Sequence, residues 1–444
     1  MRSAIFPGGT RGTTEPPKPP NQESRFAQAS KTVTRKFNAS VGPAVLSVAV
    51  NSLVNLIVVV IVAQKLNAAE MGLFLLAYST IVFVTGFNQA LNVEPLVLVA
   101  GRNASILSAI NRRMVLRSSA KLGLIVACML IVIMPFLPSE WAKSSIVLCI
   151  LLPFALVLDA NRGMLQAGSK GWSALRLDAI NFCLLGIGMS SFAWFGKDST
   201  SALICYSVPI ALTSVCVFIA VENLAKQRTT AGLANIPRKY RIDLSSEFGV
   251  MQGANQAILY STPAYLSLAE TAGFRGVQVL FGPMNIVFTA LRVAVVPRIS
   301  LDLHQKTDKS KMRIWISHGW TIVAAGAVFS LLLVFVGNSV GAILLGETWE
   351  YAKTLVLPIG VQYFALAVIS FSMLMLRATA RTSLSLAARV IQSVLAIAGG
   401  ICAWQLGELS ALGWALAITT SVSACVWISL SLIAARQFVP EEMQ

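Results

Sequence analysis

Two stretches of similar sequence, AEMGLF at residues 69–74 and AETAGF at residues 269–274, occupy matching places in the two halves of the chain. Each lies between two apolar segments, and the second of these ends at a proline. Pro95 follows the glycine of the first copy by 23 residues, and Pro297 follows that of the second by 24. This shared order predicts a duplicated unit. If each copy holds an even number of spans, both insert in the same orientation, related by an axis along the membrane normal.

The composition confines this duplication to a membrane protein. The 444 residues are 56% hydrophobic and only 12% charged, whereas a soluble domain carries about 25% charged residues. The mean hydropathy of +0.71 excludes a soluble enzyme of this length, and it excludes a disordered chain, which needs few apolar residues. Since each membrane span needs about 20 apolar residues, the chain has room for about 12 spans.

Hydropathy divides the chain into twelve apolar segments in two groups of six. The longest hydrophilic loop separates the sixth segment from the seventh. We therefore predict an all-α membrane protein of two six-helix lobes related by pseudo-two-fold symmetry. Its predicted parts are a disordered cytoplasmic tail (1–40), an N-lobe (41–222), a cytoplasmic linker (223–247), a C-lobe (248–436) and a second cytoplasmic tail (437–444). The segments are 41–63, 73–93, 120–137, 144–160, 177–196, 200–222, 248–268, 276–298, 314–336, 355–376, 387–406 and 410–434.

The basic residues orient the predicted spans. With twelve spans, 29 of the 35 Lys and Arg residues fall on the side of the two tails, and only five fall on the opposite side. Such asymmetry places both termini in the cytoplasm. It also accounts for the net charge of +16 without a nucleic-acid partner. The one basic residue that this count leaves inside a span is Arg292.

Polar side chains recur at helical spacing within the first, second and seventh segments. Polar groups in hydrocarbon are costly and normally face the interior of a helix bundle. Two interpretations stay open: the amides bind helices to one another, or they line a polar cavity between the lobes. As candidate binding residues we take Asn51 and Asn55 in the first segment, Gln89 and Asn92 in the second, and Gln252, Gln256 and Tyr260 in the seventh.

The sequence gives no sign of a metal or cofactor site. The seven cysteines all fall within predicted spans and include no Cys-x-x-Cys pair, and the two histidines, His304 and His318, have no acidic cluster at ligand spacing. No phosphate-binding loop of the Gly-x-x-x-x-Gly-Lys type is present. We therefore expect no cofactor, no metal, no ATP hydrolysis and no enzymatic activity.

Residues 66–74, the polar second span and residues 273–300 (GFRGVQVLFGPMNIVFTALRVAVVPRIS) resemble polysaccharide flippases of the O-antigen type. These belong to the multidrug/oligosaccharidyl-lipid/polysaccharide (MOP) superfamily. The shared features are a Gly-x-aromatic outer turn before the second helix and a Pro-x-Ile/Leu-Ser end to the eighth. The resemblance extends over residues 41–434 and implies a MATE-like fold with a central cavity. It further implies a bacterial plasma-membrane exporter that moves undecaprenyl-diphosphate-linked oligosaccharide outward by alternating access.

A diphosphate anion cannot cross hydrocarbon alone, so such a flippase needs cationic groups inside the protein. In the resembled family, basic residues lining the cavity serve this purpose, and Arg292 matches that position best. Its planar fork suits a diphosphate, although its side chain can also snorkel to the cytoplasmic surface. Arg275, in the outer turn, is the second candidate, with an ordinary interfacial charge as its preferred interpretation. The expected partners are the lipid-linked substrate, the bilayer, a polysaccharide polymerase and export proteins, and we expect a monomer.

Two other functions stay open. Many drug and cation antiporters of the same superfamily use a carboxylate buried in the first lobe. Here the first two spans hold none at depth, and Glu94, Asp159, Asp178 and Glu222 fall near predicted cytoplasmic ends, which disfavours an antiporter. A membrane enzyme acting on lipid-linked sugars would need positioned carboxylates or histidines, and the acids of the predicted outer loops are mostly single.

Overall fold

The computed structural model describes residues 43, 46–47, 49–96, 109–136, 138–167, 171–226, 238–285, 288, 308–378 and 382–436. Throughout these ranges the regular elements are helices, which confirms the predicted all-α class. After helix Ala49–Ala63, the first half contains α2 (Ala68–Asn88), the π-helix η1 (Gln89–Val93), α4 (Ala109–Ile133), η3 (Met134–Phe136), α5 (Ser139–Ala167), α6 (Gly171–Phe195) and α7 (Ser199–Lys226). The second half contains α8 (Arg238–Tyr265), α9 (Leu268–Leu280), α11 (Asp308–Leu345), η4 (Gly346–Thr348), α12 (Trp349–Ala352), η5 (Lys353–Leu355), α13 (Val356–Ala378), α14 (Thr382–Leu406) and α15 (Leu409–Arg436).

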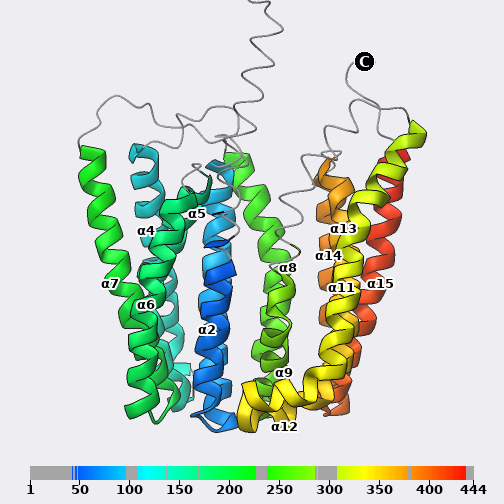
Figure 1. Cartoon of the computed structure of the whole chain (residues 1–444). Coiled ribbons are helices and arrows are strands. Elements are labelled where there is room, and N and C mark those ends of the chain that lie inside the picture. Colours follow the sequence, from blue (N-terminus) through cyan, green and yellow to red (C-terminus); the bar gives the residue numbers. More distant parts are fainter. Residues whose placement is uncertain are drawn as a thin grey trace, which may run out of the picture.

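The helices stand side by side as two bundles. Figure 1 shows α2 and α8 in the middle, with α4 to α7 on one side and α11 and α13 to α15 on the other. We call helix 49–63, α2 and α4 to α7 the N-terminal bundle, and α8, α9 and α11 to α15 the C-terminal bundle. They meet where α2 packs against α8 and α9, and we call this contact the seam. The short turns before α2, α7, α9 and α15 lie at the lower end of the molecule in Figure 1.

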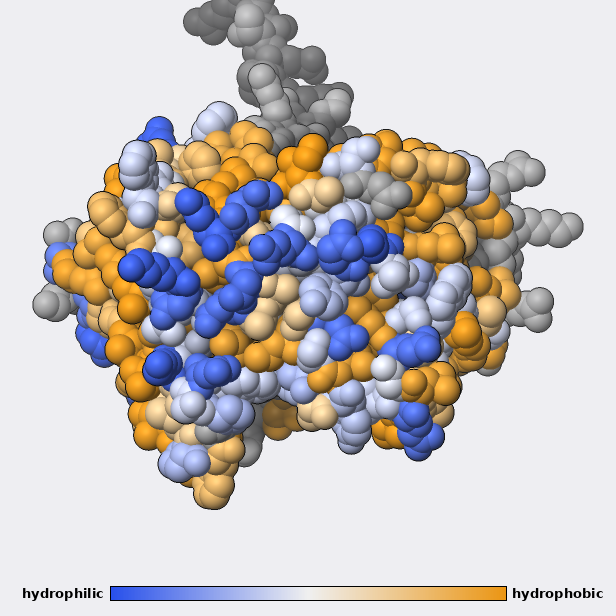
Figure 2. Space-filling view, turned by 90° about the horizontal axis from the view of Figure 1, so that it is seen from below, coloured by the Kyte–Doolittle hydropathy of each residue, from blue (hydrophilic) through white to orange (hydrophobic). Residues whose placement is uncertain are grey.

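Nine helices in the described ranges are long and apolar enough to cross a membrane, and the shorter helix Ala49–Ala63 is also apolar. Large apolar side chains cover the sides of the bundles, among them Val132, Phe335 and Leu331, which are 57–82% exposed. Figure 2 shows the lower face, where hydrophilic residues gather across the middle and hydrophobic ones surround them. Such an apolar belt with a polar end face is typical of a multi-pass membrane protein. The predicted eighth span, 276–298, lies largely outside the described residues.

Several helices extend beyond the apolar segments that predicted them. Helix α4 begins at Ala109, not near residue 120, and the predicted linker 223–247 narrows because α7 continues to Lys226 and α8 begins at Arg238. The reason is that backbone hydrogen bonding sustains a helix in the headgroup layer as well as in hydrocarbon, whereas hydropathy detects only the part in hydrocarbon. Basic residues that the sequence placed in loops therefore lie on helices.

The duplicated turns form matching helix starts. Asn67 caps α2 by accepting a hydrogen bond from the Glu70 backbone N–H at 2.9 Å, and Ser267 caps α9 by accepting one from Glu270 at 3.1 Å. The two glutamates differ in their partners. Glu270 completes a capping box on its own helix, whereas Glu70 accepts a hydrogen bond from the Ser199 N–H, at the start of α7, at 2.8 Å.

The glycines of the repeated motif allow close helix packing. A Cβ at Gly72 would lie 2.2 Å from the backbone oxygen of Leu268, so α2 touches the start of α9 across the seam. A Cβ at Gly273 would lie 2.6 Å from Cβ of Tyr351, so α9 touches α12. The same motif thus brings the two bundles together in one copy and packs the C-terminal bundle internally in the other.

Candidate functional site

Arg275 lies in the seam, where α9 meets α2, α8 and α13. Its Nη1 donates a hydrogen bond to Oε1 of Gln278 at 2.7 Å, and its buried Nε has no hydrogen-bond partner among the described residues. Within the described chain, the ionisable groups that interact electrostatically with its guanidinium are Tyr78, Tyr260 and Tyr363. We call these five residues the seam arginine site. No described carboxylate belongs to it, so within the described residues no acid compensates its positive charge.

This placement corrects the interfacial interpretation of Arg275. The residue follows the outer turn by only a few positions, which suggested a charge at the membrane surface. However, Tyr78 of α2 and Tyr363 of α13 are almost fully buried, and both lie near enough to Arg275 to interact with its charge. Arg275 itself stays partly accessible. A basic side chain held inside a bundle without a described acid beside it suits a site for an anion.

The polar face of α8 contributes to the seam in two ways. Gln256 donates a hydrogen bond from Nε2 to the backbone oxygen of Ser79 at 3.2 Å, so it binds α8 to α2. The Tyr260 hydroxyl lies 2.5 Å from Oγ1 of Thr80, and 37% of Tyr260 is exposed. Gln252 accepts a hydrogen bond from Asn255 of its own helix at 3.3 Å. Tyr260 therefore combines a contact across the seam with an accessible surface beside Arg275.

A second polar region lies entirely within the N-terminal bundle. It is a cavity of about 100 Å³, which is room enough for several water molecules. Asn51 and Asn55 line it from helix 49–63, so they face this bundle's interior and not a space shared with the C-terminal bundle. The other polar side chains around it are Tyr78, Thr85, Asp159, Arg162, Asp178, Asn181 and Tyr206.

The acidic residues of this cavity are held by hydrogen bonds and one ion pair. Asp159 forms an ion pair with Arg162 and accepts a hydrogen bond from Nε2 of Gln89 at 2.6 Å. Asp178 accepts a hydrogen bond from the hydroxyl of Ser47, and Ser47 in turn accepts one from Gln166 at 3.0 Å. With both carboxylates ionised and Arg162 protonated, the cavity carries one net negative charge. It suits a bound cation or proton.

Two assignments from the sequence change here. Asp159 lies in the second half of α5 and Asp178 in the first half of α6, near the helix ends as predicted, and both line this cavity. The argument against a buried first-lobe carboxylate therefore fails. Arg162, which the sequence placed in a loop, lies on α5 and lines the same cavity. Arg162 stands just beyond the predicted segment 144–160, whereas Asp159 and Asp178 fall at the ends of predicted segments, where hydropathy does not show that they share a cavity.

Asn92 serves helix packing. It is 2% exposed, donates to Oδ1 of Asn88 at 2.8 Å and accepts from the hydroxyl of Ser118 at 2.8 Å. These contacts join η1 to α4 and leave little capacity for a ligand. Asn92 therefore bonds one helix to another, which is the first of the two interpretations given above. Gln89, by contrast, donates a hydrogen bond to the carboxylate of Asp159, which lines the cavity.

A further basic residue, Arg389, is buried on α14. It was counted as a loop residue, yet it is only 7% exposed, its guanidinium lies 4.7 Å from the ring centroid of Trp427, and its Nη1 donates to Gln392 at 3.0 Å. Arg292, the first candidate from the sequence, lies outside the described residues. The expectation that a single basic residue stands inside the bundle is therefore wrong, because Arg275, Arg389 and Arg162 all do so. Within the described residues no group of three or more potential metal ligands occurs.

Two helical bundles that meet along one seam, with a polar cavity inside the first bundle and an arginine in the seam, define a transporter-type fold. Neither a protein-family model nor a curated protein sequence matches this chain. Solved structures do match it. An inward-facing multidrug resistance MATE family transporter of the MOP superfamily superposes with a TM-score of 0.70 at 13% identity, covering 87% of this chain and 95% of that one.

Two other solved structures show the same likeness. A MOP superfamily transporter from Pyrococcus furiosus Vc1, described as having a binding pocket of reverse polarity, gives a TM-score of 0.66 at 13% identity over 90% of this chain and 95% of its own. An outward-facing multidrug resistance MATE family transporter gives 0.62 at 14% identity, covering 90% and 95%. The chain therefore has the fold of the MATE family transporters, as its sequence predicted.

Proposed function

We propose that this protein is a lipid-linked oligosaccharide flippase: it moves an oligosaccharide attached to a polyprenyl diphosphate, of the undecaprenyl type, across the bacterial plasma membrane. The observation that supports this proposal most is Arg275 in the seam, which has no carboxylate partner among the described residues. A buried guanidinium without a carboxylate is costly, and a phosphate oxygen from the substrate offsets that cost only while substrate is bound. The site therefore favours an anionic substrate over a cationic drug.

The neighbours of Arg275 fit the rest of such a headgroup. Tyr260 is partly exposed, bonds Thr80 through its hydroxyl and interacts with the charge of the guanidinium, and Gln278 presents an amide. Hydroxyl and amide groups hydrogen-bond sugar hydroxyls, and tyrosine rings pack against their apolar faces. Arg292 stays a second proposed diphosphate ligand.

The mechanism that follows is alternating access about the seam. The close contact of Gly72 with Leu268 holds the lower ends of the bundles together, so opening toward that side requires this contact to separate. By the distribution of basic residues, we assign the lower end to the outside and both termini to the cytoplasm. Substrate then reaches Arg275 from the cytoplasmic leaflet and leaves after the lower ends part.

We assign the coupling step to the N-terminal cavity. Asp178 and Asp159 face a space lined by α2, which also forms the seam. Loss of a proton or cation there adds negative charge beside α2 and favours a different packing of that helix. A change of charge in the cavity is thereby linked to the opening of the seam.

A cation-coupled multidrug antiporter is the second candidate, and the same carboxylates favour it. The solved structures described as multidrug transporters share this fold. A cationic drug, however, would meet the positive charge of Arg275 in the seam. The two functions thus predict opposite consequences for Arg275: loss of transport if the substrate is anionic, and retained or faster transport if it is cationic.

Reconstitution in proteoliposomes separates the two functions. One assay follows a fluorescent lipid-linked oligosaccharide by its accessibility to an impermeant quencher, and the other follows efflux of a cationic dye driven by an ion gradient. The flippase predicts quencher-detected transport by the wild type that Arg275→Ala abolishes and Lys353→Gln, at an exposed outer lysine, leaves intact. Dye efflux that survives Arg275→Ala, with no flipping, would establish the antiporter instead.

A further inference from the structure

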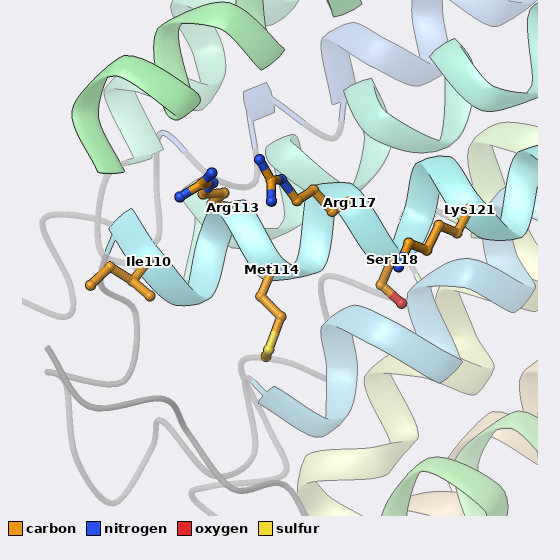
Figure 3. A pocket seen from close by; sticks show the side chains of 6 residues that line it. All are labelled: Ile110, Arg113, Met114, Arg117, Ser118 and Lys121. Carbon is orange, nitrogen blue, oxygen red and sulfur yellow. The ribbon is translucent and has the colours of Figure 1, made fainter. Parts of the chain in front are cut away.

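The outward face of α4 carries a basic pocket that belongs to neither the seam nor the N-terminal cavity. Arg113, Arg117 and Lys121 are spaced by four residues, so they share one face of the helix, as Figure 3 shows. The pocket holds about 370 Å³, and Ile110, Met114 and Ser118 complete its described lining. From Arg113 to Lys121 the basic row covers about 12 Å of helix.

The pocket is positively charged even after its ion pairs are counted. Glu222 of α7 lies 2.8 Å from Nε of Arg113 and 2.7 Å from Nε of Arg117, so one carboxylate serves two guanidinium groups. Lys121 forms no ion pair with any described residue. Three basic groups against one acid leave a net charge of about +2. The side chain of Arg117 is 52% exposed, and Lys121 is exposed as well.

The same face of α4 becomes apolar further down the helix. Leu124, Ile125, Met129 and Val132 are 54–69% exposed and continue the angular sector of Lys121. The opposite face, with Leu116 and Ser119, is buried against the bundle. An exposed apolar stripe on a membrane helix contacts acyl chains, so the basic pocket stands at the level where acyl chains give way to headgroups.

From this arrangement we infer that the α4 pocket binds the phosphate of an anionic phospholipid of the surrounding bilayer. The phosphate lies between Arg117 and Lys121, and the acyl chains follow the apolar stripe toward Val132. Basic pockets at the cytoplasmic side of membrane helices recognise acidic headgroups in this way, and the guanidinium fork provides parallel hydrogen bonds to phosphate oxygens.

Two observations favour a bilayer lipid over other occupants. Helix α4 packs mainly against α5 and α7, and its contacts with α2 and η1 are small, so the pocket lies to one side of the path proposed for the transported substrate. The first 40 residues of the chain carry seven basic and two acidic residues, so the tail has the wrong charge to fill it. The inference does not depend on which substrate the protein transports.

The test is native mass spectrometry of the full-length protein titrated with phosphatidylglycerol or phosphatidylcholine. Arg117→Gln/Lys121→Gln removes two charges and leaves Arg113 to pair with Glu222. Lys143→Gln/Lys197→Gln is the control, because it removes the same charge from exposed positions at the other end of the same bundle. With roughly a fivefold loss per basic residue, the pocket variant should bind its first phosphatidylglycerol about 30-fold more weakly, with phosphatidylcholine binding unchanged.

The outcomes separate cleanly. Unchanged phosphatidylglycerol affinity in the pocket variant, or an equal loss in the control, would overturn the inference. Tighter binding of undecaprenyl diphosphate at the same pocket, with displacement of phosphatidylglycerol, would overturn the assignment to a bilayer lipid. If the double glutamine variant does not fold, Arg117→Lys/Lys121→Arg keeps the charge and should retain phosphatidylglycerol binding. Loss of binding in that folded variant would also contradict the inference.

Discussion

The two bundles begin α2 and α9 with similar turns, but their interiors differ in polarity. The N-terminal bundle encloses a polar cavity with Asp159, Arg162 and Asp178. In the C-terminal bundle aromatic side chains pack together: the ring centroids of Phe281 and Tyr363 are 4.8 Å apart. The single charge that it turns toward the seam in the described region, Arg275, has no carboxylate beside it.

This difference indicates how a duplicated scaffold divides its work. The carboxylates of the first bundle already have partners in Arg162, Gln89 and Ser47, and in the proposed transporter they change charge by binding a proton or cation. An arginine among tyrosines lacks such a partner and needs an external anion. The duplication therefore yields one bundle suited to an ion and one suited to substrate.

The largest expected effect comes from replacing the arginine of the seam. Arg275→Ala should lower flipping of the lipid-linked oligosaccharide at least 100-fold, because the only described cation in the seam is lost. The folded state should survive, since the change removes a buried charge without a paired acid. The measurements are quencher accessibility in proteoliposomes and the thermal midpoint at matched protein level.

Arg275→Lys sharpens that prediction. It keeps the charge and loses the planar fork, so partial flipping is expected. If Arg275→Ala flips substrate at the wild-type rate, Arg275 does not bind the diphosphate, and the contrast between the two bundles loses its functional meaning.

Next in size is the effect of neutralising the first bundle. Asp178→Asn should make transport insensitive to an imposed ion gradient, lowering the driven rate about tenfold, to its undriven level. Asparagine still accepts a hydrogen bond from Ser47 and avoids burying a charge, so stability should be unchanged or higher. The measurement is the ratio of transport rates with and without a gradient.

Asp243→Asn is the matched control, because Asp243 is an exposed aspartate on α8. Its gradient response should equal that of the wild type. A normal response in Asp178→Asn would place coupling elsewhere and leave the N-terminal cavity as a structural feature only.

The sequence predicted the framework well and the site only in part. The predicted span 355–376 corresponds to α13, Val356–Ala378, and the repeated turns start matching helices, because hydropathy and capping are local properties. The sequence placed Arg275 at the membrane interface because its neighbours along the chain include only the nearby outer turn. The tyrosines that enclose it come from α2, α8 and α13, and only tertiary packing brings them together.

The same limit applies to the acids. Asp178 pairs with Ser47, 131 residues away, and no local pattern reveals such a contact. Asp159 and Arg162 belong to the charged end of α5, where the predicted segment 144–160 ends, so hydropathy assigned Arg162 to a loop. Hydropathy is therefore least informative for residues at the ends of long membrane helices, because it does not show which of them face the interior of a bundle.

A third prediction concerns the glycines of the repeated motif. Gly72→Ala and Gly273→Ala should each destabilise the protein by about 1–3 kcal/mol through overpacking, since both positions face neighbours closer than 3.0 Å. Only Gly72→Ala acts across the seam, so it alone should increase the reactivity of a cysteine introduced at Tyr260. Thermal midpoints and maleimide labelling rates provide the two readouts.

Gly186→Ala is the control, because a Cβ there meets nothing within 4 Å, and its midpoint should stay at or slightly above that of the wild type. Equal labelling rates in the Gly72 and Gly273 variants would show that the two copies of the motif do not differ in the way their contacts indicate.

The smallest expected effect concerns the helix caps of the two bundles, whose contributions to stability should depend differently on pH. Asp198 caps α7, since its Oδ1 accepts a hydrogen bond from the Ser201 N–H at 2.9 Å. Hydrogen bonds from the side chain and backbone of Ser201 hold the pKa of the Asp198 carboxyl below its ordinary value. The ionised cap therefore stabilises the fold above the ordinary aspartate pKa of about 3.9, and this contribution is lost as the pH falls through the lower pKa of the folded state.

Asp198→Ala should accordingly lower the free energy of unfolding by about 1 kcal/mol at pH 7 and by less below pH ~4. Asp198→Asn keeps a good capping side chain, so its stability at pH 7 should be close to that of the wild type. In the C-terminal bundle, Ser267 caps α9 with its hydroxyl, a group that does not titrate. The direct hydroxyl bond that Ser267→Ala removes is therefore independent of pH. Thermal midpoints of the three variants at pH 7 and pH 3.5 provide the comparison. A stability difference between wild type and Asp198→Ala that does not shrink at the lower pH would show that the carboxylate charge contributes nothing to this cap.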